Sequence, residues 1–189
     1  MNLGRSVLAL LVLFVAACGN RAVDERILAL GDEKPGVKPS EFHRPGQPCV
    51  LCHGEYLREN PVMSVAGTIY AFPAGENPLP VKGVTVKLTD ALGEQHEAGT
   101  NCAGNFFIKV DEWDPAFPLR AELEYPVPGS PDATKRVVMS TRISRDGSCA
   151  GCHFGKPLQN TPGWVTCAEA DTNPPFPAQE ASCPGAKQQ

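Results

Sequence analysis

The pentapeptide Cys-x-x-Cys-His occurs twice in the chain, at Cys49–His53 and at Cys149–His153. Two thiols at this spacing can form thioethers with the two vinyl groups of one haem, and the imidazole that follows them can ligate the iron. The chain holds only four histidines, and two of them stand directly after such a cysteine pair. The pattern therefore predicts two covalently bound haem c groups, each with its iron.

Both motifs lie in loop-like sequence, and in this respect the chain resembles exported multihaem c-type cytochromes, in which small loops carry the haems. The resemblance implies four thioether anchors, which are Cys49, Cys52, Cys149 and Cys152. It also implies that His53 and His153 are the proximal iron ligands. Monohaem cytochromes c are helical, and this chain departs from them, so their usual axial pairing is not carried over.

Each iron needs a sixth ligand or keeps an open position, and the two remaining histidines are His43 and His96. His43 lies six residues before the first motif, on a loop able to fold over a haem. His96 lies in a polar segment, where an exposed hairpin residue is the alternative. Met63 is a competing ligand, and Met/His ligation raises the reduction potential relative to bis-His ligation. An iron without a distal ligand could bind a small gas or peroxide.

Two alternatives remain for the motif cysteines: zinc or another metal, and disulfides or redox dithiols. Zinc ribbons separate their Cys pairs by about 15–20 residues, much less than the distance from Cys52 to Cys149, and would not explain both histidines. In either case the chain would be a non-haem β-sandwich binding module. A haem-dependent, peroxidase-like enzyme is a further alternative, although known dihaem peroxidases are much larger and mainly helical.

The first residues predict export. Arg5 precedes an unbroken apolar run, VLALLVLFVAA, which suits a signal peptide and is shorter than the roughly 20 residues of a transmembrane helix. The run ends in Val15-Ala16-Ala17-Cys18, which resembles the lipobox of bacterial lipoproteins and implies that Cys18 is lipidated after cleavage. We therefore expect a membrane-anchored lipoprotein, in the outer membrane or on the periplasmic side of the envelope. An ordinary secretory signal is the alternative.

Between the two motifs the hydrophobic pattern changes to period two, which is typical of half-buried strands. The expected strands are Ser64–Phe72, the segment around Val84–Leu88, Glu94–Ala98, Phe106–Val110, Leu119–Tyr125 and Arg136–Ser144. In the last strand Val137, Met139, Thr141 and Ile143 should share one side, with Met139 in the core. Short strands joined by turns, such as Ala91-Leu92-Gly93, predict an all-β fold, a small antiparallel β-sandwich.

This segment also resembles carboxypeptidase-regulatory-like and transthyretin-like sandwich modules. The resemblance lies in Val65–Tyr70, Leu79–Thr89 and Thr100–Phe106, and it implies an Ig-like or transthyretin-like fold but no activity. Haem-bearing loops and Pro-rich coil tails would flank the sandwich. We expect a signal peptide over 1–17, a lipid anchor and flexible tether over 18–45, a first haem-binding loop over 46–60, the sandwich over 61–145, and a second haem-binding loop with a Pro-rich tail over 146–189.

Three cysteines remain besides Cys18 and the motif thiols, namely Cys102, Cys167 and Cys183. An odd number permits one disulfide and leaves one thiol free. A bond between Cys167 and Cys183 would close a short loop in the tail. A bond from Cys102 to either of the others would fasten the tail to the sandwich, and the sequence leaves the choice open.

These features together predict a cell-envelope electron-transfer protein that carries two c-type haems, an electron carrier and not primarily an enzyme, with the peroxidase-like enzyme left as the alternative. Its expected partners are redox proteins of the envelope, met through small and transient interfaces, and the membrane through the lipid anchor. The formal net charge is −4 and no basic stripe is present, which excludes nucleic acid as an expected partner.

Overall fold

The computed structural model describes residues 20–33, 37–73, 78–155 and 161–184, except the side chain of Pro131. The chain divides into two units, 1–32 and 33–189. In the first unit, helix α2 covers Arg21–Ala29; its N-cap Asn20 accepts a hydrogen bond from the Val23 amide, and it has no buried residue. The helix covers the short apolar run in this region. A helix of this length gains little stability by itself.

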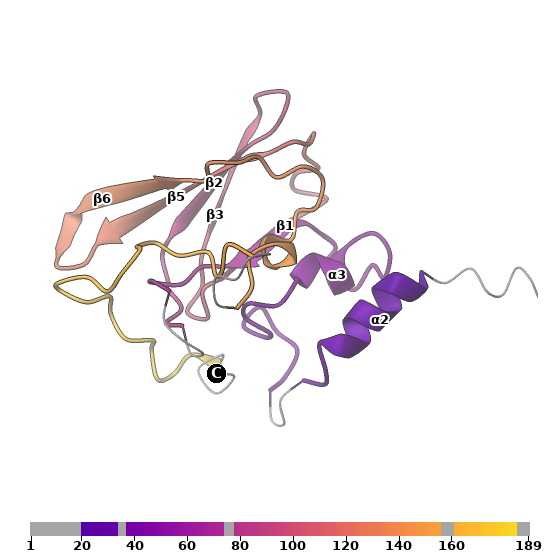
Figure 1. Cartoon of the computed structure of the whole chain (residues 1–189), viewed down its shortest axis with the longest axis horizontal. Helices are drawn as coiled ribbons and strands as arrows, with labels where there is room; N and C mark the ends of the chain where they lie inside the picture. The colour runs from indigo at the N-terminus through magenta and orange to yellow at the C-terminus, as the bar shows by residue number, and fades with distance from the viewer. Residues whose placement is uncertain (1–19, 34–36, 74–77, 156–160, 185–189) are drawn as a thin grey trace, which may run out of the picture. The chain divides into compact units, whose positions relative to one another are not determined.

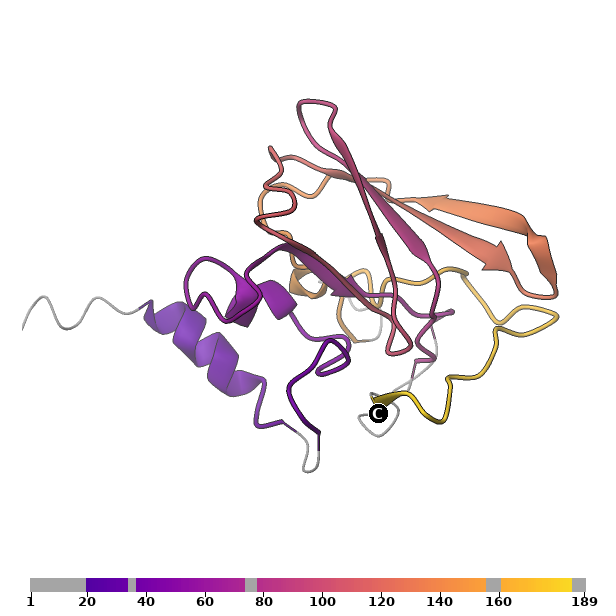
Figure 2. The ribbon, with the colours of Figure 1, turned by 180° about the vertical axis from the view of Figure 1, so that it is seen from behind.

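The second unit contains two antiparallel sheets (Figure 1). One pairs β1 (Met63–Thr68) with β4 (Asn105–Lys109). The other has the order β3-β2-β5-β6, formed by β3 (Gln95–Gly99), β2 (Thr85–Thr89), β5 (Arg120–Val127) and β6 (Ser130–Val138). The prediction of a small, all-β, antiparallel fold is confirmed, and Figure 2 shows the same arrangement from behind.

A single hydrophobic core holds the sheets together. In β2, Val86 and Leu88 are buried, and the residues that alternate with them are only partly covered, as expected for period-two alternation. These partly covered residues are Thr85, Lys87 and Thr89. The other large members of the core come from both sheets and the connections: Val65, Ile69, Val84, Phe106, Ile108, Leu119 and Leu123. The predicted Ala91-Leu92-Gly93 turn is also present, with the Asp90 carboxylate accepting hydrogen bonds from the Leu92 and Glu94 amides.

The last strand lies earlier in the chain than predicted. Residues 128–129 turn the chain directly from β5 into β6, and Gly129 takes a φ of 74°, which favours glycine. The strand ends at Val138 and forms the edge of its sheet, so Val137 and Val138 are 37% and 47% exposed. The expectation that Val137 faces the core with Met139 is therefore wrong. Ile143 keeps a single antiparallel bridge to Leu119.

The Pro-rich tail packs on the sandwich as extended chain. The amides of Cys167 and Ala168 donate to the carbonyls of Tyr70 and Ala71 at 2.9 and 2.8 Å. Farther along, Phe176 is buried beside Tyr125, with ring centroids 5.8 Å apart. A disulfide joins Cys102 to Cys183, and Cys167 is a buried free thiol. Of the alternatives left open by the sequence, the structure has the one that fastens the tail to the sandwich.

Candidate functional site

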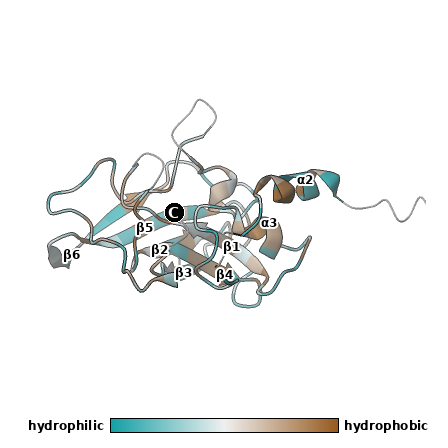
Figure 3. Cartoon of the chain, turned by 90° about the horizontal axis from the view of Figure 1, so that it is seen from below, coloured by the Kyte–Doolittle hydropathy of each residue, from teal (hydrophilic) through white to brown (hydrophobic). Residues whose placement is uncertain are grey.

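The first motif forms a single helical turn, α3, which covers Cys49–His53. The turn is mainly apolar and carries the brown of hydrophobic residues in Figure 3. Val50 and Leu51 belong to it, yet none of its residues is buried. Two exposed apolar side chains follow it, Tyr56 at 45% and Leu57 at 41%. The motif and the residues just after it therefore carry partly or well exposed apolar side chains.

His53 is oriented by its backbone surroundings. Its Nδ1 lies 3.1 Å from the carbonyl oxygens of both Glu59 and Pro61. A proton on Nδ1 can be donated to these acceptors, which leaves the lone pair of Nε2 available to a metal. Histidines that bind metals are commonly held in this way, because the hydrogen bond fixes the tautomer and the ring.

The second motif repeats this arrangement on a different backbone. The 3-10 turn η1 covers Cys149–Gly151, and the Nδ1 of His153 lies 3.0 Å from the Gly163 carbonyl oxygen. Buried Thr161 links the end of the motif to Gly163, since its hydroxyl donates to the Cys152 carbonyl at 2.8 Å and accepts from the Gly163 amide at 3.1 Å. The sequence analysis did not single out Thr161, because nothing in its local pattern distinguishes it.

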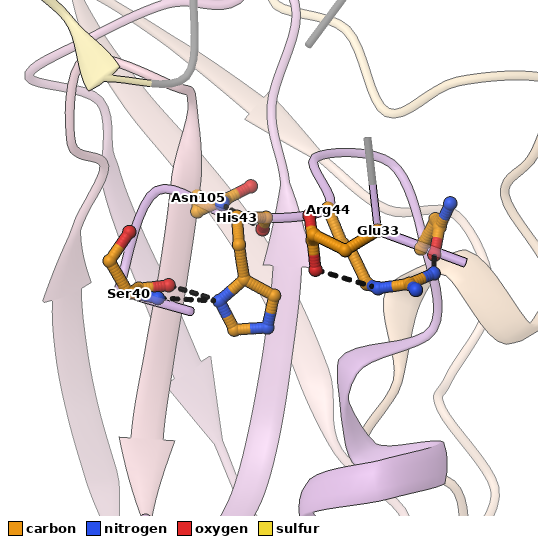
Figure 4. A network of polar contacts seen from close by, with 6 residues as sticks. Glu33, Ser40, His43, Arg44 and Asn105 are labelled. Carbon is orange, nitrogen blue, oxygen red and sulfur yellow. Dashed lines mark hydrogen bonds and ion pairs between the residues drawn. The ribbon is translucent and has the colours of Figure 1, made fainter. Parts of the chain in front are cut away.

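His43 lies against His53 with ring centroids 5.8 Å apart and planes tilted by 50°. The Nδ1 of His43 lies 3.2 Å from the Ser40 amide nitrogen and also contacts the Ser40 carbonyl oxygen, and the Nε2 edge points away from Ser40 (Figure 4). With the proton on Nδ1, directed at that carbonyl, the lone pair of Nε2 is available to a metal. Metal–imidazole bonds are about 2 Å long, so two imidazoles on one metal have ring centroids about 6 Å apart. His43 and His53 therefore have the separation of a bis-histidine pair.

A buried polar network holds the His43 loop in place. Asn105 at the start of β4 donates to the carbonyl oxygen of His43 at 3.1 Å and to that of Glu41 at 3.2 Å. Its Oδ1 accepts from the Thr68 hydroxyl at 2.7 Å, and that hydroxyl accepts from the Gly46 amide at the same distance. Within the loop, Arg44 pairs with Glu33 at 3.0 Å and bonds Gln47 (Figure 4).

The two motifs, separated by about 100 residues in sequence, meet on β1. Figures 1 and 2 show η1, in orange, beside β1 and α3. The Ala66 amide donates to the Gly147 carbonyl at 2.9 Å, and Ala66 forms a parallel bridge with Ser148. Burial raises the pKa of the Cys149 thiol to about 12, and the neighbouring Cys49 thiol contributes to this shift. The segments that lead into Cys49 and Cys149 are therefore both bound to the same short strand, through Thr68 and Ala66.

The other predicted ligands lie elsewhere. His96 is in β3 and stacks on Trp113, with ring centroids 5.5 Å apart and planes within 10°. It lines a pocket of about 240 Å³ together with Glu97 and Glu112. Met63 is buried in β1 opposite Lys109. Among the described contacts, the structure brings His43 to a motif histidine and does not bring His96 to one.

The part of the chain that the structure describes fits two haem groups in three respects. All four motif thiols are free of disulfides. Both motif imidazoles have Nδ1 at a carbonyl oxygen. Two of the buried polar atoms that lack a hydrogen-bond partner among the described residues are the Ser148 hydroxyl, beside Cys149, and the Trp164 indole nitrogen, beside Gly163. Buried donors of this kind need a partner, and a haem propionate is an acceptor.

No protein-family model, curated protein or solved structure matches the chain. Within the described ranges no cluster of three or more His, Cys, Asp or Glu side chains forms a metal site, and no helix has the length and hydropathy needed to cross a membrane. Cys18 and the expected signal peptide lie outside the described residues.

Proposed function

We propose that this chain is an electron-transfer protein of the cell envelope that carries two covalently attached c-type haems. The observation that supports this most directly is the repeated local geometry of the two motifs. At each, a helical turn presents two cysteines, and the following histidine has its Nδ1 3.0 or 3.1 Å from a backbone carbonyl oxygen. The two turns differ in backbone conformation, one α-helical and one 3-10, and their histidines contact different carbonyls, so the shared geometry supports a shared role.

The residues of the first site have separate tasks in this proposal. Cys49 and Cys52 anchor the porphyrin, and His53 supplies the proximal Nε2. His43 supplies the distal ligand, since its ring lies 5.8 Å from that of His53. Bound haem supplies one-electron chemistry at its iron, and bis-histidine ligation places the potential below that of a Met/His haem.

The residues of the second site hold its haem in the same way. Cys149 and Cys152 anchor the porphyrin, and His153 supplies the proximal ligand. The Gly163 carbonyl and the Thr161 hydroxyl fix the orientation of the imidazole. Phe154, which is 47% exposed, would cover part of the porphyrin, and a propionate would supply the acceptor that the buried Trp164 indole nitrogen lacks among the described residues.

The proposed location follows from the expected lipobox. Lipidation of Cys18 would anchor the chain to a membrane outside the cytoplasm, where disulfides persist. The Cys102–Cys183 disulfide supports this assignment, because such bonds are rare in reducing compartments. Redox proteins of the envelope are the proposed partners.

The experiment is co-expression of the full chain with a haem c maturation system, followed by a pyridine haemochrome assay and intact mass. Two haems per chain are expected. A control variant with Cys49, Cys52, Cys149 and Cys152 replaced by Ala should carry none. A colourless wild-type protein would contradict the proposal and favour a metal or disulfide module.

A further inference from the structure

Strand β1 provides the anchor for both attachment motifs. Thr68 accepts a hydrogen bond from the Gly46 amide at 2.7 Å, which fixes the segment leading into Cys49. Ala66 bonds the Gly147 carbonyl at 2.9 Å, which fixes the segment leading into Cys149. Residues two positions apart on a strand are separated by about 7 Å. The two motifs are therefore held side by side on one short piece of rigid backbone.

Gly67, between those two anchors, is the point where Cys149 lies closest to the strand. A Cβ atom at Gly67 would lie 2.7 Å from the Cys149 Cβ, 2.8 Å from its Sγ and 3.0 Å from the Phe106 ring. No real side chain fits at such distances, so the absence of a Cβ is what lets Cys149 pack onto β1. A small residue where another chain segment approaches closely is a common use of strand glycine.

Gly46 plays the corresponding part on the side of the first motif. A Cβ there would lie 2.6 Å from the Tyr70 hydroxyl and 2.9 Å from the Trp164 ring. Trp164 directly follows Gly163, whose carbonyl oxygen holds His153, and its ring lies 5.2 Å from that of Tyr70. The loop of the first motif thus packs against the loop that supports the histidine of the second.

We propose that β1 holds the two haems as an adjacent pair, attached through Cys49 and Cys149 with their porphyrins close enough to interact. The inference rests on the proposed function and goes beyond it, because two haems on one chain need not be neighbours. Each thioether joins a porphyrin edge to its sulfur, so neighbouring sulfurs place two porphyrin edges together. The electronic transitions of the two porphyrins are then coupled.

Circular dichroism in the Soret band tests this arrangement, because neighbouring porphyrins give a two-signed couplet that isolated ones do not. The holoprotein should show the couplet. Two single-haem variants, C49A/C52A and C149A/C152A, should each show a simple band, and their spectra should not add up to that of the wild type. A holoprotein with two haems and an additive spectrum would overturn the pairing and leave the proposed function intact. A protein that carries no haem after maturation would overturn both the pairing and the proposed function.

Gly67→Ala is the sharper variant, since its added methyl group must displace Cys149 or Phe106. We expect it to keep both haems by mass while the couplet changes in amplitude or sign. Gly99→Ala is the matched control, because Gly99 also lies in a strand and has no atom within 4 Å of its added Cβ. A couplet that is unaltered in G67A, or altered equally in G99A, would contradict the role of Gly67. The wild-type spectrum alone decides the pairing if G67A fails to fold.

Discussion

The imidazole rings of His43 and His53 lie 5.8 Å apart by centroid, on two segments that a buried asparagine and a helical turn position independently. The Nδ1 atoms of both rings face backbone carbonyl oxygens. With the proton of each ring on Nδ1, both Nε2 atoms have a lone pair for a metal, and the centroid separation is close to the roughly 6 Å expected for two imidazoles on one ion. The proposal that His43 and His53 are the axial ligands of the first haem rests on this separation.

Replacing His43 with Ala should convert the first haem from low spin to high spin. The change removes the distal ligand and leaves the thioethers and His53 in place, so the haem count should stay at two. Absorption and electron paramagnetic resonance spectra of the oxidised protein measure the spin state. Retention of the wild-type spectrum in H43A would show that His43 is not a ligand.

His96→Phe is the matched control for that variant. Phenylalanine keeps a ring to stack on Trp113, whose centroid lies 5.5 Å from that of His96, and removes both imidazole nitrogens. The spectrum of H96F should equal that of the wild type. A new high-spin signal in H96F would establish the ligation of His96 that the sequence analysis expected.

Thr161→Val should raise the potential of the second haem. Without the hydroxyl, the Gly163 amide and the Cys152 carbonyl lose a partner, and the Gly163 carbonyl is no longer held against His153. A lost hydrogen bond of about 1 kcal/mol corresponds to a shift on the order of 50 mV for a one-electron couple. Spectroelectrochemical titration measures it. Thr161→Ser should restore the wild-type potential, whereas a shift of the same size in T161S would argue against the hydroxyl as the cause.

Asn105→Asp should weaken the distal ligation of the first haem and leave the second unaffected. Aspartate keeps the acceptor for the Thr68 hydroxyl but removes the donors to the carbonyls of Glu41 and His43. The Glu41 carbonyl keeps the Asn101 side chain as a donor at 2.8 Å, whereas the His43 carbonyl loses the donor described for it. An unpaired carbonyl costs about 1–3 kcal/mol, so the His43 loop should detach more readily. The readout is a high-spin fraction that grows with temperature below the unfolding transition. An unchanged low-spin spectrum up to unfolding would remove Asn105 from the positioning of His43.

The Cys102–Cys183 disulfide should contribute about 2–4 kcal/mol to the free energy of unfolding, because it closes a long loop in the unfolded chain. Denaturant unfolding of the holoprotein with and without reductant measures this contribution. The C102A/C183A variant should be as unstable as the reduced wild type and insensitive to reductant. Cys167→Ala should lose some core packing yet remain sensitive to reductant, since Cys167 is a free thiol. Equal stability of the wild type with and without reductant would contradict the assigned bond.

The fold class could be predicted from the sequence because alternation is a local signal. Val86 and Leu88 face the core with Lys87 between them, as the pattern of β2 requires. The last strand could not be placed in this way. Val137 and Val138 are hydrophobic, but they lie in an edge strand and are 37% and 47% exposed. A tight turn at Gly129, and not the apolar pattern, sets where β6 begins.

The candidate site was predictable only in part. The motif residues are recognisable because their spacing is fixed by the chemistry of attachment. The meeting of the motifs on β1 depends on Gly67 and on a parallel bridge between Ala66 and Ser148, which are contacts between distant parts of the chain. Thr161 and Asn105 act through backbone carbonyls, and such roles leave no mark in a local pattern.

The most direct test of the central claim is the haem content of the full chain matured with a haem c attachment system, measured by pyridine haemochrome and intact mass together. The account predicts two haems per chain, both resistant to extraction with acidified organic solvent because they are covalently bound. One haem or none per chain, with unmodified thiols in at least one of the two motifs, would contradict it.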